Sequence, residues 1–273
     1  MSSIPTVIAV PRLEQPGRLT QARVAVSEWT KLHSLRSTRW SLLAATVLTI
    51  GFPLLFATIL STRANPLQEH RHSALEVALA GVNVSQLAIA VLGVLLITGE
   101  YSTGMIRATF TAVPKRLPVL WAKLVVYAVV SFLLMLPCVL LAFFGSQAIL
   151  GRKDLLQISF THPGVARAVI GGAVYLMLVG IFAMGLGAIV RNTAGGISTF
   201  AALFFVIPPL LNVLPTTWND AISPYLPESA ARSIFALTTD AHSLAPGPGL
   251  ALFCGYTAIA IAIAAVLLVR RDV

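Results

Sequence analysis

The chain has 273 residues, of which 57% are hydrophobic and 11% charged, and its mean hydropathy is +0.86. Because soluble domains carry about 25% charged residues, this composition excludes an ordinary soluble domain and predicts a membrane protein with several spans. The formal net charge is +9, but the cations are scattered beside apolar runs instead of forming a basic stripe among aromatic residues, which argues against nucleic-acid binding.

The N-terminal region is polar and precedes any long apolar run. It contains no apolar core followed by a small-residue cleavage site, so we expect no cleaved signal peptide. We predict a flexible tail over residues 1–18 and an amphipathic helix over 19–39 that lies on the membrane surface. Its apolar side would carry Val26, Trp29 and, less regularly, Leu32. A loosely ordered basic tail is the alternative.

Six apolar stretches follow, each close to the roughly 20 residues that a helix needs to cross a bilayer. The sequence therefore predicts an all-α, polytopic membrane domain over residues 40–273. Pro208 and Pro209 must kink the fifth span or end it before Asn212. The predicted spans are Trp40–Leu60, Leu79–Thr98, Val119–Phe144, Ala168–Val190, Gly195–Leu214 and Leu250–Val269.

The distribution of lysine and arginine sets the orientation of these spans. Most of the 19 cations flank the spans on the side of the N-terminus, and this predicts that both termini are cytoplasmic in a multi-pass protein of the cell membrane.

Small residues such as Ala183 and Gly187 in span four, and Gly195 and Gly196 in span five, favour close helix packing. We therefore expect spans four and five to form a tight antiparallel pair.

Polar residues inside the spans are few. Apart from Lys123 and Arg167, near the ends of their spans, the apolar cores contain no ionisable residue, which argues against ion-coupled transport. Asn83, Gln86 and Asn212 are candidates either for interhelical hydrogen bonds, which we favour, or for contacts along a transport pathway.

Catalytic and metal-binding motifs are missing from the sequence. No HExxH, GxSxG or paired-carboxylate pattern occurs, so we predict no catalytic residue, no metal site and no cofactor. No GxxxxGK[ST] phosphate-binding loop occurs either, so we expect any ATP hydrolysis to take place in another chain.

The segment between spans two and three predicts a short cytoplasmic helix. Ile106, Phe110 and Val113 share one face at i, i+4 and i+7, and Pro114 ends the helix. About ten residues give a rod of roughly 15 Å, which is suited to the groove of a partner protein. A capped loop turn is the alternative.

Between spans five and six, Pro227 followed by Glu228 predicts a short outer helix, which either gates a pathway or caps the bundle.

This arrangement, over nearly the whole chain, resembles a type-2 ABC transporter permease, the membrane subunit of a six-span exporter. The local match runs through Gly99-Glu100, then Gly104-Met105-Ile106-Arg107, then Pro114-Lys115-Arg116, and ends at Ala122-Lys123. Related permeases often have Thr at the position of Met105, and this difference affects a local cap or hydrogen bond at most.

The resemblance implies that two permeases pair, as a homodimer or a heterodimer, and bind separate ATP-binding-cassette ATPase subunits that hold ATP and magnesium. Ile106, Phe110 and Val113 would then fit into the ATPase groove, and Glu100 would anchor the base of span two. Charged contacts at the edge of the groove are implied for Arg107, Lys115 and Arg116, whose positive charge could instead mark only the membrane topology.

The uncharged interior suggests an apolar or amphipathic substrate, and export follows from the resemblance alone. The sequence is also compatible with two other functions. One is an ion-coupled secondary carrier or channel, and the other is a membrane anchor subunit that transports nothing. Membrane lipids are expected neighbours in each case.

Overall fold

The computed structural model describes residues 21–63, 71–102, 104, 116–152, 157–213, 215–237 and 243–270. All regular structure in these ranges is helical, and six of the helices are long and apolar enough to cross a membrane. The predicted all-α fold and six spans are therefore confirmed. The observed spans are Arg36–Thr62, Ala74–Tyr101, Leu117–Gly151, Val165–Val190, Thr193–Leu211 and Pro246–Arg270.

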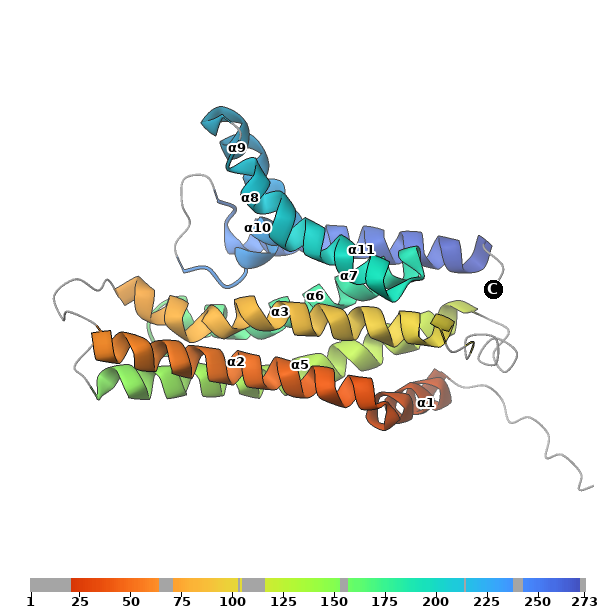
Figure 1. Ribbon diagram of the computed structural model, residues 1–273, viewed down its shortest axis with the longest axis horizontal. Helices are drawn as coiled ribbons and strands as arrows, with labels where there is room; N and C mark the ends of the chain where they lie inside the picture. The colour runs from red at the N-terminus through yellow and green to blue at the C-terminus, as the bar shows by residue number, and fades with distance from the viewer. Residues whose placement is uncertain are drawn as a thin grey trace, which may run out of the picture.

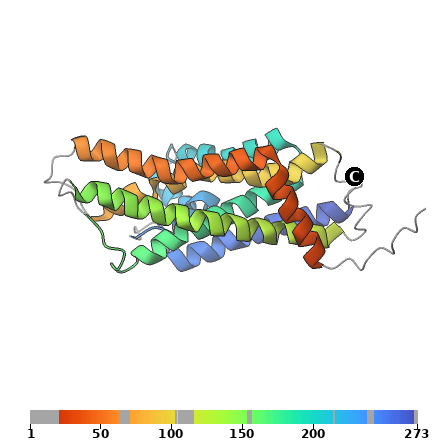
Figure 2. The ribbon, with the colours of Figure 1, turned by 90° about the horizontal axis from the view of Figure 1, so that it is seen from below.

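The first two helices meet at a sharp corner. Helix α1 (Gln21–Ser34) crosses the end of the bundle, and after Leu35 the chain turns into α2 (Arg36–Arg63), as Figure 2 shows. The first span begins before the predicted Trp40, because the polar residues at its start continue the same helix. Val26 and Trp29 are exposed while Leu32 is buried, so α1 turns Leu32 toward the bundle and the other two residues away from it.

Helices α3 (Arg71–Ser102) and α6 (Val165–Val190) form the centre of the bundle, and α5 (Arg116–Gly151) packs against both. The most buried span is α6, and its most extensive contact is with α3. The two backbones approach closely at Gly93 of α3, where an added Cβ would lie 2.3 Å from the carbonyl oxygen of Gly180 in α6.

This packing corrects the prediction that spans four and five form the tight pair. Span five touches α6 at its start, where Gly196 lies against Gly187 and Val94, but it then leaves the bundle. The small residues of α6 serve several neighbours instead, since Gly187 lies against α3, Gly180 against α5 and Gly185 against the sixth span.

Span five consists of α7 (Thr193–Ala201), the π-helical turn η1 (Ala202–Val206) and α8 (Ile207–Leu211). In the wide turn, the backbone N–H of Ile207 donates to the carbonyl of Ala202. The next two residues are prolines, which lack the N–H needed to continue the regular α-helical pattern. The predicted kink before Asn212 is therefore present, and Figure 1 shows the outer half of this span pointing away from the other helices.

The outer segment between spans five and six contains α9 (Thr216–Ile222), the 3₁₀ turn η2 (Ser223–Tyr225) and α10 (Pro227–Arg232), followed by span six in α11 (Pro246–Arg270). The short helix predicted at Pro227 is thus present as α10. It packs closely on α11, since a Cβ added at Gly249 would clash with the carbonyl oxygen of Ala230.

The cytoplasmic helix predicted between spans two and three falls almost wholly outside the described residues. This applies to Ile106, Arg107, Phe110, Val113 and Lys115, whereas Arg116 is the first residue of α5. The predicted tail over residues 1–18 also lies outside them.

Candidate functional site

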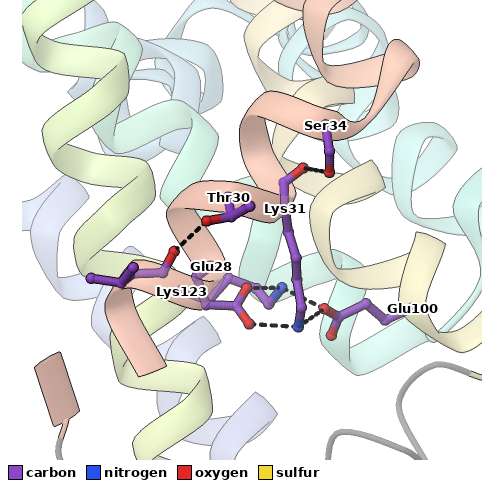
Figure 3. Close-up of polar contacts among 7 residues, drawn as sticks. Glu28, Thr30, Lys31, Ser34, Glu100 and Lys123 are labelled. Atoms are coloured by element: carbon purple, nitrogen blue, oxygen red, sulfur yellow. Dashed lines mark hydrogen bonds and ion pairs between the residues drawn. The ribbon is translucent and has the colours of Figure 1, made fainter. Parts of the chain in front are cut away.

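The most polar site among the described residues is a buried cluster of four charged side chains at one end of the bundle. Lys123 lies in the apolar span α5 and its side chain is only 9% exposed. An ammonium group at such a position needs acidic partners, because an unpaired buried charge costs several kcal/mol. Its Nζ donates to Oε2 of Glu28 at 2.6 Å and to Oε1 of Glu100 at 2.9 Å (Figure 3).

A second lysine completes the cluster. Glu28 and Lys31 are three residues apart on α1, so they lie on the same face of that helix. Nζ of Lys31 donates to Oε1 of Glu28 at 2.7 Å and to Oε1 of Glu100 at 3.0 Å (Figure 3). Two carboxylates and two ammonium groups therefore alternate, the cluster has no net charge, and α1, α3 and α5 are held together by ionic contacts.

The neighbouring charges change the protonation of Lys31, which lies outside the membrane spans. Burial on its own would lower its pKa, but the hydrogen bond and charge of Glu28, together with the charge of Glu100, outweigh this effect and raise the pKa above its ordinary value. Lys31 is therefore positively charged at any physiological pH.

A cavity of about 460 Å³ lies beside the cluster. Besides the four charged residues, its walls carry Leu32, Ser34, Leu35, Ser37, Leu95, Leu96 and Gly99. The cavity is thus lined both by ionic groups and by leucine side chains.

A second group of polar contacts lies at the opposite end of the bundle. Nε of Arg232 in α10 donates to Oδ1 of Asn83 in α3 at 3.2 Å, and Nη1 of Arg232 lies 2.9 Å from Oε1 of Glu228. The hydroxyl of Tyr175 in α6 donates to Oε1 of Gln86 in α3. Asn83 and Gln86 therefore both form hydrogen bonds to other helices, one of them to the outer helix α10.

Arg167 adds a further attachment of the outer segment. Its guanidinium group donates to the backbone carbonyls of Ile234 at 3.1 Å and Ala236 at 2.8 Å. Asn212 lies elsewhere and accepts from Nδ2 of Asn219 in α9 at 3.4 Å. The outer segment is thus bound to α3 and α6 by side chains of those helices, while Asn212 belongs to a separate contact.

Glu228 is buried in this outer group. Burial raises the pKa of its carboxyl group above the ordinary value of 4.5, and the nearby Arg232 offsets only part of that effect.

Of the residues singled out from the sequence, the structure brings together Glu100 and Lys123. Glu28 and Lys31 were not predicted to belong to this site. A signal for them existed, because Lys123 had no acid nearby in its own span and Glu28 with Lys31 forms an i, i+3 pair on an amphipathic helix.

Among the described residues, no group of three or more His, Cys, Asp or Glu side chains is arranged to hold a metal ion. Comparison of the chain with protein-family models and with curated proteins finds no match.

Proposed function

We propose that this multi-span membrane protein is the permease subunit of an ATP-driven ABC transporter, driven by separate ATPase subunits that bind ATP and magnesium. It would export an apolar or amphipathic substrate and would work as a homodimer or with a second permease. The chain itself then has no catalytic residue and no cofactor of its own.

The position of the ion cluster is the main support for this proposal. Glu100 lies at the end of α3 and Lys123 near the start of α5, so the cluster joins the two helices that flank the predicted ATPase-binding segment. Both are also bound to α1. A force applied to residues 103–115 would therefore move α1, α3 and α5 together.

The charge distribution within the spans supports the same interpretation. In the described spans the charged residues lie within about two turns of a span end, and the middle of each span is apolar or uncharged. Carriers driven by ion gradients generally need ionisable groups or unwound helices near the membrane midplane.

Purification of the tagged chain from its native membranes in mild detergent tests the proposal. We expect a protein with a phosphate-binding loop to co-purify, and the complex to hydrolyse ATP with sensitivity to vanadate. Arg107→Glu should reduce the amount of ATPase subunit that co-purifies several-fold. Arg152→Glu, at the other end of α5, should leave this amount unchanged. Reproducible absence of an ATPase would contradict the proposal.

The same experiment distinguishes the alternatives. An ion-coupled carrier would move its solute in vesicles that contain the purified chain alone. A membrane anchor subunit would co-purify with a partner that lacks a phosphate-binding loop.

A further inference from the structure

Two exposed tryptophans indicate that the cavity beside the ion cluster lies at the depth of lipid headgroups. Trp40 at the start of α2 is 70% exposed and Trp29 on α1 is 48% exposed, and exposed tryptophans of this kind mark the interface between membrane and water. The residues that line the cavity belong to α1, Leu35 and the helices α2, α3 and α5, and Figure 2 shows α1 crossing the end of the bundle. A lipid of the adjoining leaflet can therefore reach it.

The walls of the cavity match a molecule that is polar at one end and apolar at the other. Its volume of about 460 Å³ falls within the range of small-molecule sites. Its lining combines the apolar Leu35, Leu95 and Leu96 with the polar Lys31, Ser37 and Glu100. A phospholipid headgroup with the first part of its acyl chains combines the same two kinds of group.

The polar wall has both a donor and an acceptor to offer. Lys31 has three N–H donors, and two of them are used by Glu28 and Glu100. Both lysines donate to Oε1 of Glu100, and within the described ranges no residue donates to its Oε2. Among the described residues, Lys31 therefore keeps one N–H donor and Glu100 keeps Oε2 as an acceptor, in a site of zero net charge.

We propose that this cavity binds the phosphoethanolamine headgroup of a membrane phospholipid. The phosphate accepts from Nζ of Lys31, with the hydroxyl of Ser37 as a second donor, and the primary ammonium group donates to Oε2 of Glu100. The acyl chains leave the cavity along Leu35 and Leu95. This inference needs only the membrane location of the chain and is independent of the proposed transport function.

The proposal predicts a particular choice among phospholipids. Phosphatidylcholine has the same net charge and phosphate, but its quaternary ammonium group has no N–H to donate to Glu100. Phosphatidylglycerol has no cation and would bring an unbalanced negative charge to a neutral cluster. Phosphatidylethanolamine should therefore bind most tightly of the three.

Native mass spectrometry of the purified full-length chain tests this choice, with the three lipids added in equal amounts and with identical acyl chains. We expect phosphatidylethanolamine to be retained about tenfold over phosphatidylcholine, which is the order of effect of one hydrogen bond to a charged group. Equal retention of these two lipids, or stronger retention of phosphatidylglycerol, would overturn the assignment.

A cavity-filling variant locates the bound lipid without altering the ion cluster. Leu35→Trp places a larger side chain in the cavity and should abolish the preference for phosphatidylethanolamine. Leu43→Trp, at an exposed position of α2 that does not line the cavity, is the matched control and should keep it. An unchanged preference in Leu35→Trp would show that the lipid binds elsewhere and would contradict the proposal.

Discussion

Lys123 is the more buried of the two cations in the ion cluster. It contacts both acids, so its removal leaves Glu28 and Glu100 with Lys31 as their only cation in the cluster. We predict that Lys123→Met destabilises the protein by about 3–5 kcal/mol, the usual cost of breaking a buried ion pair. Thermal unfolding of the purified chain in detergent measures the loss.

Adding Glu28→Gln to Lys123→Met should restore part of this stability, because it removes a carboxylate that has lost one of its two ammonium partners. A double-mutant cycle provides the control. Strictly additive effects of the two substitutions would show that the charges do not interact.

Glu228 gives the outer end of the bundle a dependence on pH. The pKa of Glu228 is higher in the folded protein than the ordinary value of 4.5. At a pH between these two pKa values, the folded protein therefore holds a proton that the unfolded chain releases. This contribution to stability is present below pH 4.5 and is lost as the pH rises through the folded pKa.

We therefore predict that the melting temperature rises as the pH falls from 7 to 4.5, and that Glu228→Gln makes it less dependent on pH. Glu76→Gln, at an exposed position of α3, should behave like the natural chain. The measurement is thermal unfolding in detergent at a series of pH values, and an equal slope in all three proteins would contradict the prediction.

The site could be predicted from the sequence only in part. A lysine in an apolar span requires a counter-charge, and the sequence singles out Glu100 only through the family resemblance, as the anchor of span two. The contact of Lys123 with Glu28 joins residues 95 positions apart, and no local pattern determines such a pairing. The direction in which α1 faces decides it, and the exposed Val26 and Trp29 show that a hydrophobic stripe alone does not fix that direction.

At the scale of elements, the packing of α3 against α6 depends on glycine. A Cβ at Gly93 would lie 2.3 Å from a backbone oxygen of Gly180, which cannot move without separating the helices. We predict that Gly93→Ala lowers the stability by about 1–3 kcal/mol, as overpacking does. Thermal unfolding in detergent measures the change.

Gly255 in α11 is the matched control, since an added Cβ there meets no atom within 4 Å. Gly255→Ala should be neutral, or stabilising by up to about 1 kcal/mol, because alanine favours the helix. Similar losses in both variants would show that the close approach of α3 and α6 does not determine the effect.

Length and hydropathy were sufficient to predict all six spans, because a helix in lipid must satisfy its own backbone. The choice of neighbours was harder to predict. Spans four and five are joined by a short turn and are both rich in small residues, but the two prolines after η1 direct span five away from α6. Small residues permit a close approach and do not specify which helix makes it.

At the scale of the whole molecule, α1 and the C-terminal end of α11 lie at the same end of the bundle, with the ion cluster, and the α5 end at Gly151 lies at the other (Figure 1). The positive charge near the N-terminal end predicts that this end is cytoplasmic. A green fluorescent protein fused after Val273 should therefore fluoresce, and alkaline phosphatase fused after Arg152 should be active. The reverse pattern in the two fusions would contradict the orientation.

The π-helical turn in span five also affects residues beyond it. A π turn holds one residue more than an α turn, so every side chain after Val206 is rotated by about 100° relative to a continuous α-helix. The surface that Leu210 and Val213 present to their surroundings is therefore set by a single additional backbone unit in the Ala202–Val206 segment. Deleting one residue there would turn a different side of the helix outward, without changing any of the side chains that follow.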